Sequence, residues 1–128
     1  FVALYCNDGS RMLPRPISIC EIDKEEGALR VVYRVTGENT GTKQFSECKP
    51  GDTIPVIGPL GNGFPLDKAE GKKALLIGGG IGVPPIVELA KQLKAEEKNM
   101  LFQDSIASIS AKNMLKKYHN GKFLYFCI

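Results

Sequence analysis

The chain has 128 residues, of which 43% are apolar, so it can fill a hydrophobic core and wholesale disorder is excluded. Its net charge of +3 is small and dispersed, and no basic run is interleaved with aromatic residues, which argues against nucleic acid as a partner. No apolar stretch approaches the roughly 20 residues that span a bilayer. The opening residues lack the charged flank of a signal peptide. We therefore expect a cytoplasmic protein without membrane contact.

The cysteines are interpreted as structural. Cys6, Cys20, Cys48 and Cys127 show no metal-ligand spacing. Each lies in an apolar, strand-like context, where a free thiol acts as a small hydrophobic group, and such thiols fit a reducing compartment. The chain also begins with phenylalanine in the middle of a strand pattern. We take this start as the sign of a fragment or a trimmed chain.

The first part of the chain predicts short strands separated by turns. We expect strands over 1–6, 17–22, 29–36 and 53–57. The alternation is clearest in the third, whose apolar residues Leu29, Val31, Tyr33 and Val35 fall on one face. Glycine-rich loops are expected over 37–42 and 58–63. Closely spaced short strands are typical of an antiparallel barrel or sandwich.

The pattern changes near Glu70. Residues 74–77 form a continuous apolar run, which is typical of a parallel strand buried on both faces. Four glycines follow within residues 78–82. An amphipathic helix is then predicted by apolar residues at i, i+3, i+4 and i+7, namely Ile86, Leu89, Ala90 and Leu93. Strand, glycine loop and helix together open a nucleotide-binding α/β unit.

Beyond residue 98 the pattern weakens. Asp104 or Ser105 could cap a helix that carries Ile106, Ile109, Leu115 and Tyr118. Residues 123–128 would then form an apolar strand. The expected organisation is a barrel over 1–69, the start of an α/β domain over 70–98, and an unassigned tail over 99–128.

The glycine loop is the first candidate site. Glycines cluster where the backbone is left-handed or where a ligand approaches it closely. The dinucleotide fingerprint G-x-G-x-x-G fails at Val83, and the pattern that fits is G-x-G-x-x-P from Gly80 to Pro85. A pyrophosphate would suit the helix N-terminus that follows. From these residues alone, a nucleotide-binding turn and a merely tight strand–helix turn both stay open.

Two arginines are further candidates. Arg15 precedes Pro16 at a strand start, where its guanidinium could fork onto a phosphate or simply lie at the surface. Arg34 lies on the face opposite Tyr33, where it is either a ligand contact or a solvated charge. The single histidine, His119, has no partner for a hydrolytic triad. We therefore expect no catalytic residue and no metal ligand.

Five motifs follow one another along the chain: Arg15-Pro16-Ile17-Ser18, Tyr33-Arg34-Val35, Gly41-Thr42, Gly58-Pro59-Leu60-Gly61-Asn62-Gly63-Phe64, and Gly78-Gly79-Gly80-Ile81-Gly82-Val83-Pro84-Pro85. In combination and in this order, they resemble the ferredoxin reductase superfamily, and most closely its electron-transfer subunits of type B dihydroorotate dehydrogenases. The first and fourth motifs favour this subunit over its relatives. The resemblance covers residues 1 to about 98.

The resemblance implies an FAD-binding antiparallel barrel followed by an NAD-binding α/β domain. It places Arg15 and Arg34 at the FAD phosphates, Ser18 at the flavin edge, and Gly41 with Thr42 at the pyrophosphate. Gly80 and Gly82 would let NADH approach. The full set of implied cofactor-binding residues is Arg15, Pro16, Ile17, Ser18, Val32, Tyr33, Arg34, Gly41, Thr42, Gly80 and Gly82.

The implied activity is electron transfer between NAD(H) and a dihydroorotate dehydrogenase catalytic subunit, its partner in a heterotetramer of pyrimidine biosynthesis. One alternative is an NADH-linked subunit of the same superfamily that serves ferredoxin or sulfur reduction. Another is a truncated, non-catalytic remnant.

The chain departs from this family in three ways. Its opening barrel strands are missing, its loop 37–42 is longer than usual, and residues 99–128 do not look like the family. The family's [2Fe–2S] cluster needs four thiolates, which Cys127 alone cannot supply. We therefore expect a truncated or frame-disrupted copy that is not active alone, with residues 123–128 as an exposed, aggregation-prone strand.

Overall fold

The structure is a computed structural model that describes residues 1–9 and 11–96 and the backbone of 100–104 and 123–127. Its elements in chain order are β1 (Val2–Leu4), β2 (Arg15–Ile17), β3 (Ile19–Asp23), β4 (Ala28–Arg34), α1 (Gly41–Glu47), β5 (Val56–Ile57), the 3-10 turn η1 (Leu66–Ala69), β6 (Ala74–Gly78), the 3-10 turn η2 (Gly80–Gly82), α2 (Val83–Ala95), β7 (Met100–Asp104) and β8 (Phe123–Cys127).

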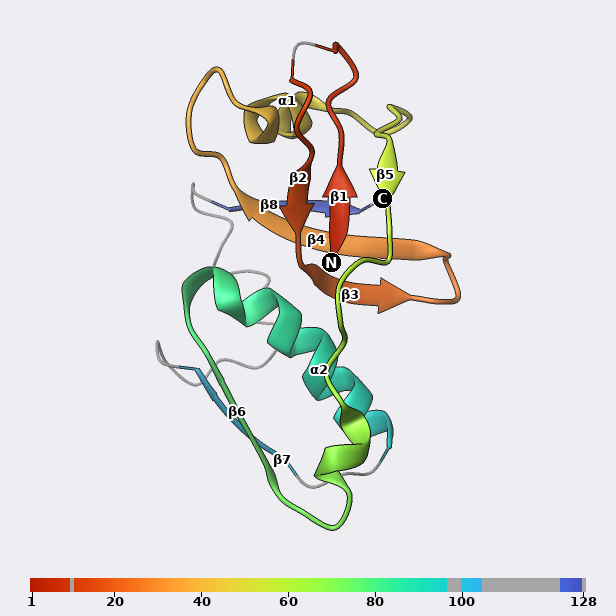
Figure 1. The fold of residues 1–128 in the computed structure, drawn as a ribbon, viewed down its shortest axis with the longest axis vertical. Coiled ribbons are helices and arrows are strands. Elements are labelled where there is room, and N and C mark those ends of the chain that lie inside the picture. Colours follow the sequence, from red (N-terminus) through yellow and green to blue (C-terminus); the bar gives the residue numbers. More distant parts are fainter. Residues whose placement is uncertain (10, 97–99, 105–122, 128) are drawn as a thin grey trace.

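Two antiparallel sheets and one parallel pair organise these elements. The antiparallel sheets have the orders β2-β1-β5 and β3-β4-β8, and β6 pairs with β7 in parallel. In Figure 1 the strands of the two antiparallel sheets cross steeply, and α2 lies below them beside β6 and β7. The described residues therefore form an unclosed antiparallel barrel followed by the start of an α/β unit, as the sequence predicts.

The barrel core lies where β1, β4 and α1 meet. It consists of Val2, Leu4, Val31, Tyr33 and Phe45. The Tyr33 and Phe45 rings pack edge to face, with centroids 6.2 Å apart. Leu29 and Val35 pack against this cluster. The apolar face predicted for residues 29–36 is therefore confirmed.

The strand expected over 17–22 is in fact two strands that meet at Ser18. β2 pairs with β1, whereas β3 pairs with β4. The chain thus passes from one sheet to the other at Ser18, which a continuous alternating pattern conceals. The outer strands are also shorter than expected, at Val2–Leu4 and Val56–Ile57.

The loop expected over 37–42 ends in a helix that the sequence analysis missed. The Oγ1 atom of Thr40 accepts a hydrogen bond of 3.2 Å from the backbone N–H of Lys43, which caps α1. Gly41 and Thr42 therefore form the first turn of α1 instead of a loop. A seven-residue helix is too short to be stable alone, so α1 depends on Phe45, which is buried in the core.

In the second unit the parallel pairing of 74–77 is confirmed, but burial on both faces is wrong. Leu76 is 7% exposed, whereas Leu75 and Ile77 are 59% and 62% exposed. Among the described residues only α2 covers this sheet, on the face of Leu76. The helix begins at Val83, with proline in its first turn, as predicted.

The last part of the chain contains one strand that was expected and one that was not. β8 confirms a strand within 123–128, and its backbone pairs antiparallel with β4 from Arg30 to Arg34. The pairing covers one edge of β8, and the expectation that this strand is exposed stays a prediction. β7 was not predicted, and the expected helix from 104 or 105 lies outside the described residues. No described helix has the length and apolar character needed to cross a bilayer.

Cys20 on β3 makes stability sensitive to alkali. Burial, and then the nearby Glu21 carboxylate, raise the pKa of this thiol to about 11, from its usual value near 8.5. Burial likewise raises the pKa of Tyr33 to about 12. At pH values between the two pKa values of each group, the unfolded chain binds fewer protons than the folded chain. Stability should therefore fall as pH rises.

We predict that urea midpoints fall in two steps, one for Cys20 above roughly pH 9 and one for Tyr33 above roughly pH 10. In Cys20→Ala the first step should become smaller while the second persists, and the thiol of Cys48, whose pKa burial also raises, should leave a remainder of the first step. Identical pH dependences in the two proteins would contradict the assignment.

Candidate cofactor-binding site

Arg15 and Gly41, distant in the sequence, lie against each other. Arg15 is half-buried on β2, and its Nη1 donates a hydrogen bond of 2.7 Å to the carbonyl of Leu13. A Cβ atom added to Gly41 would lie 3.2 Å from Arg15 Nε and 2.9 Å from Cys6 Sγ. A guanidinium has five N–H donors, so Arg15 keeps donors for an anion besides the one that binds Leu13, while Gly41 is buried beneath Arg15 and Cys6. These residues fit a phosphate-bearing cofactor.

The hydroxyl of Thr42 is less available than the sequence suggests. Thr42 is 8% exposed, and its Oγ1 lies 3.0 Å from Oγ1 of Thr40. The Thr40 hydroxyl in turn donates to the carbonyl of Gly37 at 2.8 Å. Thr42 therefore helps to hold the start of α1.

The remaining barrel candidates divide into exposed and buried residues. Pro16, Ser18 and Arg34 are exposed, and Ser18 lies where the chain changes sheets. Ile17 packs on the core. Val32 and Tyr33 are buried, and the Tyr33 hydroxyl has no hydrogen-bond partner among the described residues. On β4, Arg34 is thus the candidate whose side chain can reach a ligand.

The glycines of the strand–helix turn have different reasons to be glycine. At Gly78 a Cβ atom would lie 3.0 Å from Ile86 Cδ1 and 3.3 Å from Val83 Cα, so the packing of α2 requires it. Gly80 has a left-handed φ of 54°. Gly82 has no such φ, and nothing lies within 4 Å of its added Cβ atom. Neither crowding nor conformation explains Gly82, and its exposed bare backbone leaves room for a ligand.

β4 brings the candidate motifs together. Both β2, which carries Arg15, and η2, which carries Gly80 and Gly82, neighbour β4. In Figure 1, β3 and β4 lie between α1 above and α2 below. The glycine turn and the arginine-bearing strands are therefore parts of one arrangement, although 65 residues separate Arg15 from Gly80 in the sequence.

The described residues do not fit a [2Fe–2S] cluster. Cys6, Cys20 and Cys48 are free thiols, and Cys20 is buried within β3. In the part of the chain that the structure describes, no three His, Cys, Asp or Glu side chains gather as metal ligands would.

The fold has a counterpart among solved structures. It is shared with the cytochrome P450 reductase of Amycolatopsis, known from a crystal structure, with a TM-score of 0.65 and 26% sequence identity. The similarity covers 91% of this chain and 37% of that one. No family model matches the chain. The unclosed barrel followed by the start of an α/β unit is thus an architecture that this chain shares with part of that reductase.

Curated proteins with similar sequences share one name. The chain is 55% identical over 83 residues to the electron transfer subunit of dihydroorotate dehydrogenase B (NAD(+)) from Bacillus caldolyticus. It is 58% identical over 83 residues to that of Geobacillus sp. WCH70, and 55% identical over 97 residues to that of Streptococcus thermophilus. These matches take in 64 to 75% of this chain but only 32 to 37% of the relatives. The resemblance expected from the motifs is confirmed, and the chain spans about a third of the subunits it resembles.

The close contact at Gly41 gives a test of the site's geometry. We predict that Gly41→Ala destabilises the protein by about 1–3 kcal/mol, because the added methyl group must displace Cys6 or Arg15. Gly37→Ala is the matched control, since its Cβ atom would meet only Thr40 Cγ2, at 3.6 Å. Neither glycine has a left-handed φ. Chemical denaturation measures both variants, and equal stabilities would show that Gly41 is not crowded.

Proposed function

We propose that this chain is the part of a dihydroorotate dehydrogenase electron-transfer subunit that binds FAD and receives NAD(H). The observation that carries the proposal is the contact between the Arg15 side chain and the bare backbone of Gly41. A cationic fork at the start of a capped helix turn is suited to a pyrophosphate. The names of the relatives support the assignment to this subunit.

In this proposal the barrel, residues 1–69, binds and orients FAD. Arg15 and Arg34 would hold its phosphates, the first beside Gly41 and the second from the exposed end of β4. Ser18, exposed where the chain changes sheets, would lie against the flavin edge. When bound, FAD supplies the exchange between two-electron and one-electron transfer. The protein contributes the binding site and its orientation.

The α/β segment that begins near residue 70 would receive NAD(H). Gly80 and Gly82 add no side chain to the turn before α2, where only Ile81 carries one, and η2 neighbours the barrel strand β4. A dinucleotide bound at this turn would therefore lie next to the barrel, where FAD is proposed to bind. The partner would be a dihydroorotate dehydrogenase catalytic subunit, in the heterotetramer that the resemblance implies.

A second candidate is an NADH-linked subunit of the same superfamily that serves another acceptor. The similarity to a cytochrome P450 reductase favours it, because the same fold serves a different partner there. The two candidates share the FAD site and differ in the acceptor. Mixing the flavin-loaded chain with a dihydroorotate dehydrogenase catalytic subunit and measuring dihydroorotate-dependent reduction of NAD(+) separates them.

We predict that Arg15→Ala weakens FAD binding by roughly 10- to 100-fold, the range for losing charge-assisted hydrogen bonds. Arg15→Lys should recover part of the affinity, because lysine keeps the charge but not the fork. Titration of the chain with FAD, followed by the change in flavin fluorescence, gives the dissociation constants.

Arg11→Ala is the matched control for this experiment. Arg11 lies on the same hairpin and forms an ion pair of 3.3 Å with Asp8, so its removal should leave FAD affinity within about twofold. Equal losses in the Arg11 and Arg15 variants would mean that only net charge matters. A wild-type chain that takes up no FAD would overturn the proposal and favour a non-catalytic remnant.

A further inference from the structure

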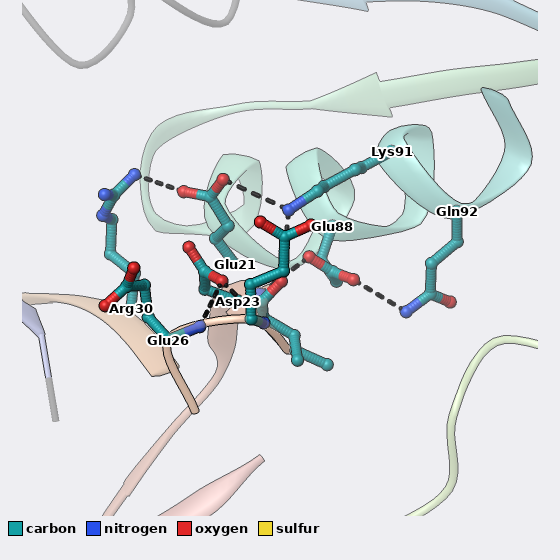
Figure 2. Close-up of polar contacts among 9 residues, drawn as sticks. Glu21, Asp23, Glu26, Arg30, Glu88, Lys91 and Gln92 are labelled. Carbon is teal, nitrogen blue, oxygen red and sulfur yellow. Dashed lines mark hydrogen bonds and ion pairs between the residues drawn. The ribbon is translucent and has the colours of Figure 1, made fainter. Parts of the chain in front are cut away.

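The polar face of α2 packs on the barrel. The helix carries Glu88, Lys91 and Gln92 at positions i, i+3 and i+4, which share one face. Ile86, on the other side of the helix, contacts β6 at Gly78. Figure 2 shows Glu88 and Lys91 directed at β3. The helix therefore uses its apolar face for its own unit and its polar face for the barrel.

The target of this face is the outer edge of β3. Among the described residues β3 is hydrogen-bonded to a strand only on its β4 side, so its other edge presents unpaired backbone groups. The backbone N–H of Ile22 donates a hydrogen bond of 3.0 Å to Glu88 Oε2, and its carbonyl accepts one of 3.1 Å from Lys91 Nζ. Two side chains of a helix thus satisfy Ile22 as a neighbouring strand would.

The charged side chains of α2 and of β3 in this contact are paired with one another or with a neighbour. Lys91 Nζ also lies 3.3 Å from Glu21 Oε1, while Glu21 Oε2 pairs with Arg30 on β4. The second oxygen of Glu88 accepts a hydrogen bond of 2.9 Å from Gln92. Each charged group therefore has a partner, and the contact continues from α2 across β3 to β4 (Figure 2).

We infer that Glu88 and Lys91 are positioning residues that fix α2, and with it the glycine turn of η2, on the edge of the barrel strand β3. Gly82 ends this turn and is also the residue that precedes α2, so the turn moves with the helix. A helix fixed at Glu88 and Lys91 holds the turn at a set place relative to β4. The consequence for electron transfer rests on the proposed function, whereas the docking itself does not.

The docking is tested without any cofactor, by amide hydrogen exchange in the full chain. In Glu88→Ala the Ile22 amide should exchange at least about tenfold faster, since it loses a hydrogen bond to a charged acceptor. Glu88→Gln keeps an acceptor oxygen and should restore most of the protection. Residual dipolar couplings of the α2 and β4 amides then show whether the helix keeps its orientation on the barrel.

Lys94 provides the matched control for Lys91. It lies exposed on the same helix and is not a member of this network, so Lys94→Met should leave both the Ile22 exchange rate and the couplings unchanged. Lys91→Met should reduce the couplings of α2 relative to those of β4. Unchanged exchange and couplings in Glu88→Ala and Lys91→Met would overturn the inference, with or without bound FAD.

A third measurement connects docking with function. In the FAD-loaded chain, Glu88→Ala should slow flavin reduction by NADH at least about tenfold, should leave the FAD dissociation constant unchanged, and should be rescued by Glu88→Gln. If the Ile22 amide exchanges faster but NADH reduces the flavin at an unchanged rate, Glu88 and Lys91 act only in docking. That result would overturn their role in electron transfer. A wild-type chain without FAD would refute the proposed function, while exchange and couplings still decide the docking.

Discussion

The packing of Tyr33 against Phe45 is the contact on which the barrel depends. Tyr33 comes from β4 and Phe45 from α1, and both lie in the core with Val2 and Leu4 of β1. This contact holds a seven-residue helix that could not persist alone. Because β2 pairs with β1, the same core fixes Arg15 relative to α1. The approach of Arg15 to Gly41 is thus a consequence of core packing and not of local sequence.

A second constraint, the open edge of β3, relates the barrel to the α/β unit. An exposed strand edge needs polar partners or protection, and α2 supplies them through side chains. A helix whose apolar face is used by β6 can do this only with polar residues. The proposed FAD and NAD(H) sites would therefore be brought into register by hydrogen bonds and ion pairs, whose directionality fixes the helix at one place on the strand edge.

The elements that could be predicted are those with a strong local pattern. Alternation identified β4, and the glycine turn with its prolines identified the start of α2. α1 escaped because Phe45 is its one large core residue, so no helical period is visible. The single strand expected over 17–22 is two strands because a change of sheet at Ser18 leaves no mark on alternation. Burial of 74–77 on both faces was inferred from hydropathy, which cannot show that, in the part of the chain that the structure describes, Leu75 and Ile77 stay exposed.

In the candidate site, too, local sequence patterns reveal individual residues but not the contacts that tertiary packing creates between them. Motif order pointed to Arg15 and Gly41 separately, but the distance between them depends on α1, which the sequence did not reveal. Glu88 and Lys91 escaped for a different reason, since charged residues opposite an apolar stripe are typical of a solvated helix face. What distinguishes them is a partner, the edge of β3, about 70 residues earlier in the chain. A polar helix face becomes a specific interface when the opposing surface offers backbone groups that only polar side chains can satisfy.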